Sequence, residues 1–269
     1  MSKMYHIQAE PGDISPYVLL PGDPKRVPLV ASLWDEAHLV ADNREHCTYT
    51  GVYKGMPITC TSTGMGCPST AIAMEELARC GAKTFLRMGT CASMQPWVKR
   101  NDICVFDSAC RFDGTTKMYV PVEYPAVANH EMVEGIIQAV RDLEIPYHVG
   151  TSRCVDAIFT NRPEEESSFN NYHPKNWDNF LPDLAQANVI AGEMESSAVL
   201  VLSRIWGLRG AALCAVVGDL MSYYRCGEKF IFDKNAIYTQ DTAARLNFVA
   251  CEAMLRIYQN DQKQTAVQD

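Results

Sequence analysis

The stretch from residue 57 to residue 90 constrains the fold most, because it reads as a strand, a turn, a helix and a second strand. The runs PITCTST and TFLRMGT are short and apolar, as buried strands are. Between them, Pro68 stands at a first-turn position and Gly81 ends the helix, while Met74 and Leu77 share one helical face. Strands that alternate with helices predict an α/β fold with a largely buried central sheet.

The same alternation continues along the 269 residues of the chain. The runs YVLL, HLVAD, DICVFDSACR and RGAALCAVVG read as further strands. Helical patterns run from near Pro125 through Val140, and from roughly Ala236 to Gln259. No repeat and no linker interrupts this order, so we expect one domain over residues 1–269. The polar, Pro- and Asn-rich segment at about 160–183 is expected to be an ordered surface excursion, and a lid is its functional version.

Composition argues against several classes of protein. The net charge of −8 leaves no basic stripe for a general nucleic-acid binder. No apolar run is long enough to cross a membrane, and residues 1–6 lack the apolar region of a signal peptide, so we expect a cytoplasmic protein. The 11 cysteines are scattered without C-x-x-C spacing, which predicts reduced thiols, and the 6 dispersed histidines predict no metal site.

Four segments combine a polar or glycine-containing turn with groups that suit an anion. Gly22 and Arg26 lie in PGDPKR after a strand, Arg44 lies in DNRE, and STGMGCP opens a helix. Arg87 lies inside an apolar strand, where a charge needs an acidic partner or an anionic ligand. Each turn alone also fits an ordinary surface turn, and Arg87 also fits a structural ion pair. A planar guanidinium suits phosphate, so we favour the ligand for Arg87.

Glu193 and Glu195 bracket Met194 in the stretch AGEMESSAVL. Residues i and i+2 share one face of a strand, so the two carboxylates fit a glycosidase-type acid and base pair. They also fit a clamp on sugar hydroxyls, or the acidic start of a helix. A glycosidase pair leaves Arg87 and the glycine-containing turns without a role, which argues against it. These residues alone leave the clamp and the helix start open.

Five stretches, in this order and at these separations, resemble the nucleoside phosphorylase family: VLLPGDPKRV, ADNREHCTYTG, STGMGCPSTAIAMEELARCGAKTFLRMGT, VPVEYPAVAN and GEMESSAVL. The resemblance runs from about His6 to the final helix and is greatest to the uridine phosphorylase branch. It implies an α/β single domain with a central mixed, partly barrel-like β-sheet flanked by helices. It also implies a pentosyltransferase, in which inorganic phosphate attacks the anomeric carbon of a nucleoside and releases the base and a pentose 1-phosphate.

The resemblance also implies roles for individual residues, with inorganic phosphate as co-substrate and no cofactor. Glu195 would accept the 2′- and 3′-hydroxyls of the ribose, and Glu193 would support the site or cap backbone donors. Arg44 and His6 would reach the neighbouring subunit's phosphate and 5′-hydroxyl, which implies a homodimer or a trimer of dimers. The implied phosphate-binding residues are Gly22, Arg26, Arg44, Arg87 and Thr90, and the implied ribose-binding residues are His6, Met194 and Glu195.

Base recognition is where the chain departs from the family pattern. Asn161 and Arg162 follow Asp156-Ala157-Ile158-Phe159, in the region where uridine phosphorylases usually carry a Gln and an Arg. Leu220 stands where a second Arg is expected. The implied base-binding residues are Thr90, Cys91, Ala92, Phe159, Asn161, Arg162 and Asp219.

Two readings of the substrate follow from these departures. A uridine-type pyrimidine nucleoside fits the overall resemblance. A purine nucleoside fits Asp219, since an Asp just after this strand donates a proton toward N7 in the purine branch; Arg87, Glu195 and Asp219 are then the implied catalytic residues. Cys67 and Ala92 stand where relatives commonly have Gly, so a non-catalytic nucleoside-binding protein is a further alternative. A hydrolytic nucleosidase has no need of three arginines.

Overall fold

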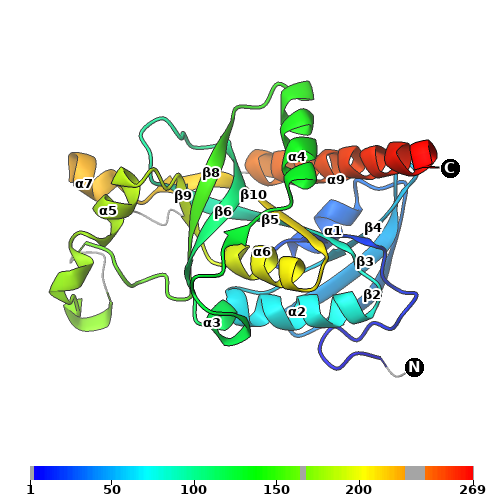
Figure 1. Ribbon diagram of the computed structural model, residues 1–269, viewed down its shortest axis with the longest axis horizontal. Coiled ribbons are helices and arrows are strands. Elements are labelled where there is room, and N and C mark those ends of the chain that lie inside the picture. Colours follow the sequence, from blue (N-terminus) through cyan, green and yellow to red (C-terminus); the bar gives the residue numbers. More distant parts are fainter. Residues whose placement is uncertain (1–2, 164–167, 228–239, 269) are drawn as a thin grey trace.

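A computed structural model of the chain describes residues 3–163, 168–227 and 240–268. Its centre is a mixed sheet of ten strands in the order β10-β6-β8-β9-β5-β1-β4-β3-β2, with β7 paired to β6 (Figure 1). A further pairing of β10 with β5 closes β10, β6, β8, β9 and β5 into a barrel. The prediction of a mixed, partly barrel-like sheet is therefore confirmed. The strands are β1 (Tyr17–Leu20), β2 (Glu36–Asn43), β3 (His46–Tyr53), β4 (Met56–Thr61), β5 (Thr84–Ser93), β6 (Ile103–Phe112), β7 (Ala126–Val127), β8 (Tyr147–Val155), β9 (Ala191–Glu193) and β10 (Arg209–Asp219).

Strand direction decides where a site can form. The strands β4, β1, β5 and β10 are neighbours in that order and run parallel to one another. Their carboxyl ends therefore meet at one edge of the sheet, where the turns that follow β1 and β4 also lie. β2, β3 and β4 form an antiparallel meander that extends the sheet away from the barrel.

Helices cover the sheet on both sides (Figure 1). α2 packs with α6 on one side of the barrel, and α4 packs with α9 on the other. Buried apolar side chains fill both contacts. α4 and α9 share one apolar cluster with the sheet, and α2 and α6 share another. The helical segments are α1 (Arg26–Ala31), α2 (Cys67–Arg79), α3 (Thr115–Tyr119), α4 (His130–Asp142), η2 (Phe169–Asn171), η3 (Lys175–Trp177), α5 (Phe180–Gln186), α6 (Ser196–Ile205), α7 (Ser222–Cys226) and α9 (Gln240–Gln268).

Each strand and helix that was predicted from its sequence pattern is present, with two differences at helix ends. α4 begins at His130 rather than near Pro125, because Ala126–Val127 pairs with β6 and the Asn129 side chain accepts the Met132 N–H at 3.0 Å. The last helix continues past Gln259 to Gln268, and the first part of its predicted range lies outside the described residues.

The segment 160–183 contains η2, η3 and the start of α5, and its residues 164–167 also lie outside the described residues. Whether it acts as a lid stays a prediction.

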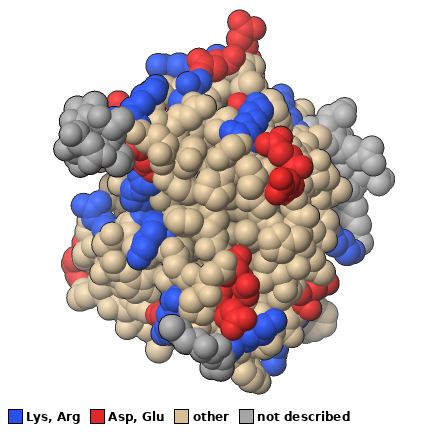
Figure 2. Space-filling view, turned by 90° about the vertical axis from the view of Figure 1, so that its right-hand side faces the viewer, with Lys and Arg blue, Asp and Glu red and all other residues tan. Residues whose placement is uncertain are grey.

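Surface charges and cysteines bear on the expectations drawn from composition. Acidic and basic side chains are interspersed over the face in Figure 2, with uncharged surface between them. All 11 cysteines are free thiols, and most are buried among apolar side chains. Within the described ranges, no helix combines the length and apolar character that crossing a bilayer requires.

Candidate active site

A cavity of about 600 Å³ lies at the edge where the carboxyl ends of the parallel strands meet. Its walls come from the turns after β1 and β4, from β5, and from the ends of β8, β9 and β10. Segments far apart in the sequence therefore meet in one space. The predicted site residues that line the cavity are Gly22, Arg26, Arg87, Thr90, Cys91, Ala92, Arg162, Met194 and Glu195.

The two glycine-containing turns touch each other at the rim of this cavity. The Gly64 N–H donates to the Gly22 carbonyl at 3.0 Å, and a Cβ on Gly22 would lie 3.2 Å from the Gly64 oxygen. Glycine thus permits this close approach. Arg26 follows on α1, buried and lining the cavity, with guanidinium N–H groups donating to the Met88 carbonyl and the Asn247 side chain at 3.2 Å each.

Arg87 lies on β5 between two carboxylates. Its Nε donates to Glu193 at 2.8 Å, and its Nη2 forms an ion pair with Glu195. The guanidinium folds over Gly89, where a Cβ would lie 2.5 Å from Nη2, so residue 89 has to be small. Burial alone would lower the pKa of Arg87, but Glu195 and Glu193 raise it, so the group is a permanent cation. The acidic partner required by a buried Arg is therefore present within the chain itself.

Glu193 and Glu195 have different surroundings although both are buried. Glu193 accepts the backbone N–H groups of Glu195 and Ser196 at 2.8 and 2.9 Å, so it caps the start of α6 and orients Arg87. Glu195 accepts the Gly66 N–H at 2.6 Å and faces the cavity. Burial raises the pKa of Glu195, the positive charge of Arg87 opposes the rise, and Glu193 adds to it. Glu193 is thus a supporting group, and Glu195 is the carboxylate exposed to a ligand.

Arg153 on β8 is a cavity residue that sequence reasoning missed. It lies opposite Gly192 of β9, and its guanidinium carbon is 5.5 Å from the ring centre of Phe180. Arg162 lies at the same end of the cavity, buried, with its Nε donating to the Ile158 carbonyl at 2.6 Å. The GTSRCVD run that holds Arg153 offered no apolar context to mark it as buried.

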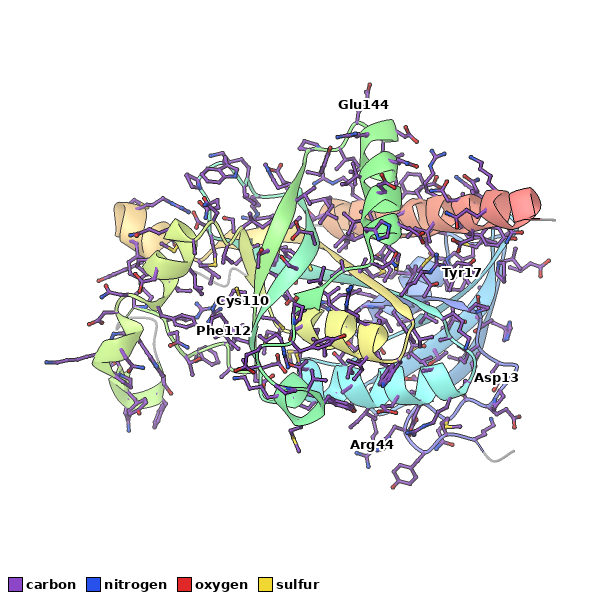
Figure 3. All side chains as sticks on the ribbon, viewed as in Figure 1. Asp13, Tyr17, Arg44, Cys110, Phe112 and Glu144 are labelled. Atoms are coloured by element: carbon purple, nitrogen blue, oxygen red, sulfur yellow. The ribbon has the colours of Figure 1, made fainter. Side chains whose placement is uncertain are left out.

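Five predicted site residues do not line the cavity of their own chain. His6 contacts Glu76 through Nδ1 at 2.7 Å, and Arg44 is exposed in the β2–β3 turn, at the lower margin of Figure 3. Phe159 is 58% exposed, and Asn161 donates to the Thr160 side chain. Asp219 accepts the Met221 N–H at 2.8 Å and pairs with Arg225. The roles implied for these residues stay predictions.

The positions that depart from the family pattern fall in different places. Ala92 and Leu220 line the cavity. Cys67 is buried instead in the core, where its sulfur lies 3.3 Å from the Met194 carbonyl and 3.7 Å from the Cys154 sulfur. Across the described ranges, no three His, Cys, Asp or Glu side chains are grouped to hold a metal ion.

Known proteins are similar to this chain in sequence and in fold. A family model described as the phosphorylase superfamily matches residues 16–246. A uridine phosphorylase from Thermococcus kodakarensis is 45% identical over 227 residues, covering 84% of this chain and 81% of that protein. A guanosine phosphorylase from Halorubrum lacusprofundi is 39% identical over 222 residues, covering 82% and 86%. The crystal structure of uridine phosphorylase from Vibrio fischeri ES114 superimposes with a TM-score of 0.81 at 29% identity, covering 95% of this chain and 98% of that one.

Proposed function

Because this chain belongs to the phosphorylase superfamily, as its motifs predicted, we propose that it catalyses the phosphorolysis of a nucleoside, with uridine-type pyrimidine nucleosides preferred. Inorganic phosphate is the co-substrate, and the products are the free base and a pentose 1-phosphate. One observation carries the proposal: Arg87 and Glu195 form an ion pair in a cavity that Arg26 and the Gly22 turn also line. That arrangement supplies cations for an oxyanion beside a carboxylate that accepts hydroxyl groups.

The phosphate end supports nucleophilic attack from solution. Arg26 and Arg87 present fixed N–H donors, and the backbone of the Gly22 turn approaches without side-chain hindrance. Holding phosphate in line with the anomeric carbon removes much of the entropic barrier before the bond changes. Phosphate also brings negative charge to an oxocarbenium-like sugar, so a carboxylate nucleophile is not required.

The sugar end supports binding of the ribose hydroxyls. Glu195 is held by the Gly66 N–H and by Arg87, so its orientation is fixed before substrate binds. Its acceptor oxygens suit the 2′- and 3′-hydroxyls, and Met194 offers a soft apolar face to the ring. Beyond them, Val155, Ile158 and Val217 give the cavity an apolar wall for a planar base.

Base release with and without phosphate tests the proposal. We expect phosphate-dependent release of uracil from uridine, followed by absorbance, with thymidine, inosine and adenosine as competing substrates. Arg26→Met should raise the KM for phosphate about tenfold or more, because a charge-assisted contact is lost. Lys25→Met removes the neighbouring exposed cation and should leave that KM unchanged. Base release that does not need phosphate would overturn the proposal.

A purine nucleoside is a second candidate substrate, and the guanosine phosphorylase relative favours it. In that case Asp219 would leave Arg225 and donate a proton toward N7 of the base. Asp219→Asn should then reduce inosine turnover far more than uridine turnover. Equal effects on both substrates would remove Asp219 from base recognition.

We also propose that a neighbouring subunit completes the site, which makes the protein a homodimer or a trimer of dimers. Asn43 Nδ2 donates to the His6 carbonyl at 2.6 Å, so His6 and the turn that carries Arg44 form one surface. That surface can reach a second copy of the chain, as the family resemblance implies.

Subunit mixing tests this assembly. Arg44→Ala and Glu195→Gln should each be nearly inactive as homo-oligomers, because every site lacks one residue. A refolded equimolar mixture should recover about a quarter of the wild-type activity, since half of random dimers are mixed and each has one complete site. Absence of recovery, together with a monomer by light scattering, would contradict a shared site.

A further inference from the structure

Arg153 is a buried cation for which the described part of the chain supplies no acidic partner. Its residue exposure is 4%, and it lines the cavity from β8. Neither Nε nor Nη2 has a hydrogen-bond partner among the residues that the structure describes. Burial and the positive charge of Arg162 lower the pKa of Arg153 to about 10, so keeping the guanidinium charged in this place costs free energy. A buried N–H donor that lacks an acceptor lowers the stability of the folded protein, which indicates that a ligand supplies the missing acceptors.

Arg111 on the adjacent strand shows how this fold satisfies a structural arginine. Its guanidinium donates to the carbonyls of Thr116, Val120 and Pro121 and thereby holds the chain that follows α3. Arg111 and Arg153 each pair in register with a cysteine of the other's strand. One guanidinium is thus saturated by the protein, while the other belongs to a residue that lines the cavity and keeps two N–H groups without partners among the described residues.

Small and apolar neighbours hold Arg153 in place without neutralising it. A Cβ on Gly192 would lie 3.5 Å from Arg153 Nη1 and 2.7 Å from Leu220, so the glycine provides the space. Phe180 covers the guanidinium from α5 and contacts the ring of Phe112. Figure 3 shows Cys110 and Phe112 at the end of β6 on the side toward α5. This packing orients the guanidinium and excludes water from its apolar side.

We propose that Arg153 is a specificity-determining residue that selects nucleosides whose base presents carbonyl oxygens and leaves as an anion, so dioxo bases of the uracil type are preferred over amino bases such as cytosine and adenine. The inference rests on the proposed phosphorolysis and identifies a base subsite within the same cavity. A guanidinium has donors and no acceptor, so it pairs with carbonyl oxygens and repels exocyclic amino groups.

The bond changes explain why a cation helps at this position. The glycosidic C1′–N bond breaks, and its electron pair moves onto the base, where the carbonyl oxygens share the negative charge. A phosphate oxygen forms the new bond to C1′, and the base anion later takes a proton from water. Arg153 strengthens its interaction as that charge develops, so it stabilises the transition state more than the bound substrate.

Substrate series with matched variants test the proposal. Arg153→Met removes the charge at similar volume, Arg153→Lys keeps a charge without the planar fork, and Arg141→Met repeats the change on the exposed surface of α4. We expect Arg153→Met to lower kcat/KM for uridine about 10- to 100-fold and to leave cytidine nearly unchanged. Across 5-substituted uridines, the dependence of kcat/KM on base acidity should become steeper in Arg153→Met, an effect that altered packing alone does not produce. Arg153→Lys should fall between.

Binding of free bases separates this inference from the proposed function. Calorimetry with uracil and with the more acidic 5-nitrouracil should show tighter binding of the acidic base, and Arg153→Met should abolish that difference. If the wild type turns over no nucleoside, but Arg153→Met still loses the difference in affinity between the two bases, the proposed phosphorolysis is overturned and charge recognition by Arg153 is retained. Unchanged base discrimination in a folded Arg153→Met protein, with wild-type phosphorolysis intact, would overturn the inference alone.

Discussion

The two ends of the cavity hold their buried charges in different ways. At one end, Arg87 lies between Glu193 and Glu195, and Glu193 also binds the first N–H groups of α6. At the other end, Arg153 has the ring of Phe180 on one side and another cation, Arg162, as its charged neighbour. Arg87 thus has counterions within the chain, whereas no acidic side chain of the described residues pairs with Arg153.

This difference separates what folding completes from what a ligand completes. A buried ion pair with further hydrogen bonds is formed as the chain folds, so its geometry is set before any ligand arrives. A lone buried guanidinium lowers the stability of the empty protein, and that loss is offset when a ligand supplies acceptors. The same substitution should therefore lower stability at the first end and not at the second.

Arg87→Met should have the largest effect, because it removes the cation that pairs with Glu193 and Glu195. Two carboxylates would remain buried without their cation, which costs about 3–5 kcal/mol of unfolding free energy. Loss of the proposed contact with phosphate should also lower kcat/KM about a thousandfold. Urea denaturation and steady-state kinetics measure the two effects. A variant with normal stability and normal phosphate dependence would show that the pair has no role.

Arg153→Met, in contrast, should not lower stability. Removing a buried charge that lacks a partner should leave the unfolding free energy unchanged or raise it by about 1 kcal/mol, while uridine turnover falls. Thermal and urea denaturation without ligand give the sign. A loss of about 2 kcal/mol or more would mean that Arg153 is a structural cation like Arg111, and the contrast between the two ends would disappear.

The paired end could be predicted from the sequence because its residues contrast with their neighbours. Arg87 is a charge within an apolar run, and Gly22 and Gly64 interrupt strand-like segments. Arg153 lies in a run that is already polar, so composition gave no sign of burial. Its place in the cavity wall depends on the pairing of β8 with β9 at Gly192, a contact between segments far apart in the chain.

The fold shows the same division between local and long-range information. Each strand named from its apolar run is present, because burial selects apolar residues locally. β8 was missed because YHVGTSRCV mixes polar and apolar residues without alternation. Closure of the barrel could be expected only from the family resemblance, since it requires β10 to pair with both β5 and β6, and no local pattern encodes these registers.

Gly192→Ala tests whether the two ends of the cavity are independent, because it crowds only the end that holds Arg153. The new Cβ would lie 2.7 Å from a terminal methyl of Leu220, whose flexible end has to move toward the cavity. We expect a loss of about 1–3 kcal/mol in stability and a lower kcat/KM for uridine, with an unchanged KM for phosphate. A raised KM for phosphate would show that the two ends are not independent.

Glu76→Gln should have a small effect on stability and serves as a reference for a paired carboxylate outside the cavity. Glu76 accepts the N–H groups of Ile7 and His6 at 2.8 and 3.0 Å. Burial alone would raise the pKa of Glu76, but these donors lower it, in contrast to the raised pKa of Glu195. A lowered pKa means that the stabilisation is full above the ordinary pKa of Glu and is lost as the pH falls through the lowered value.

We expect Glu76→Gln to cost about 1–2 kcal/mol at neutral pH and to reduce the fall in stability below about pH 4, measured by urea denaturation across pH. If stability falls equally at low pH in Glu76→Gln and in the wild type, the lowered pKa of Glu76 does not contribute to folding. The difference in pKa between Glu76 and Glu195 would then have no effect on stability.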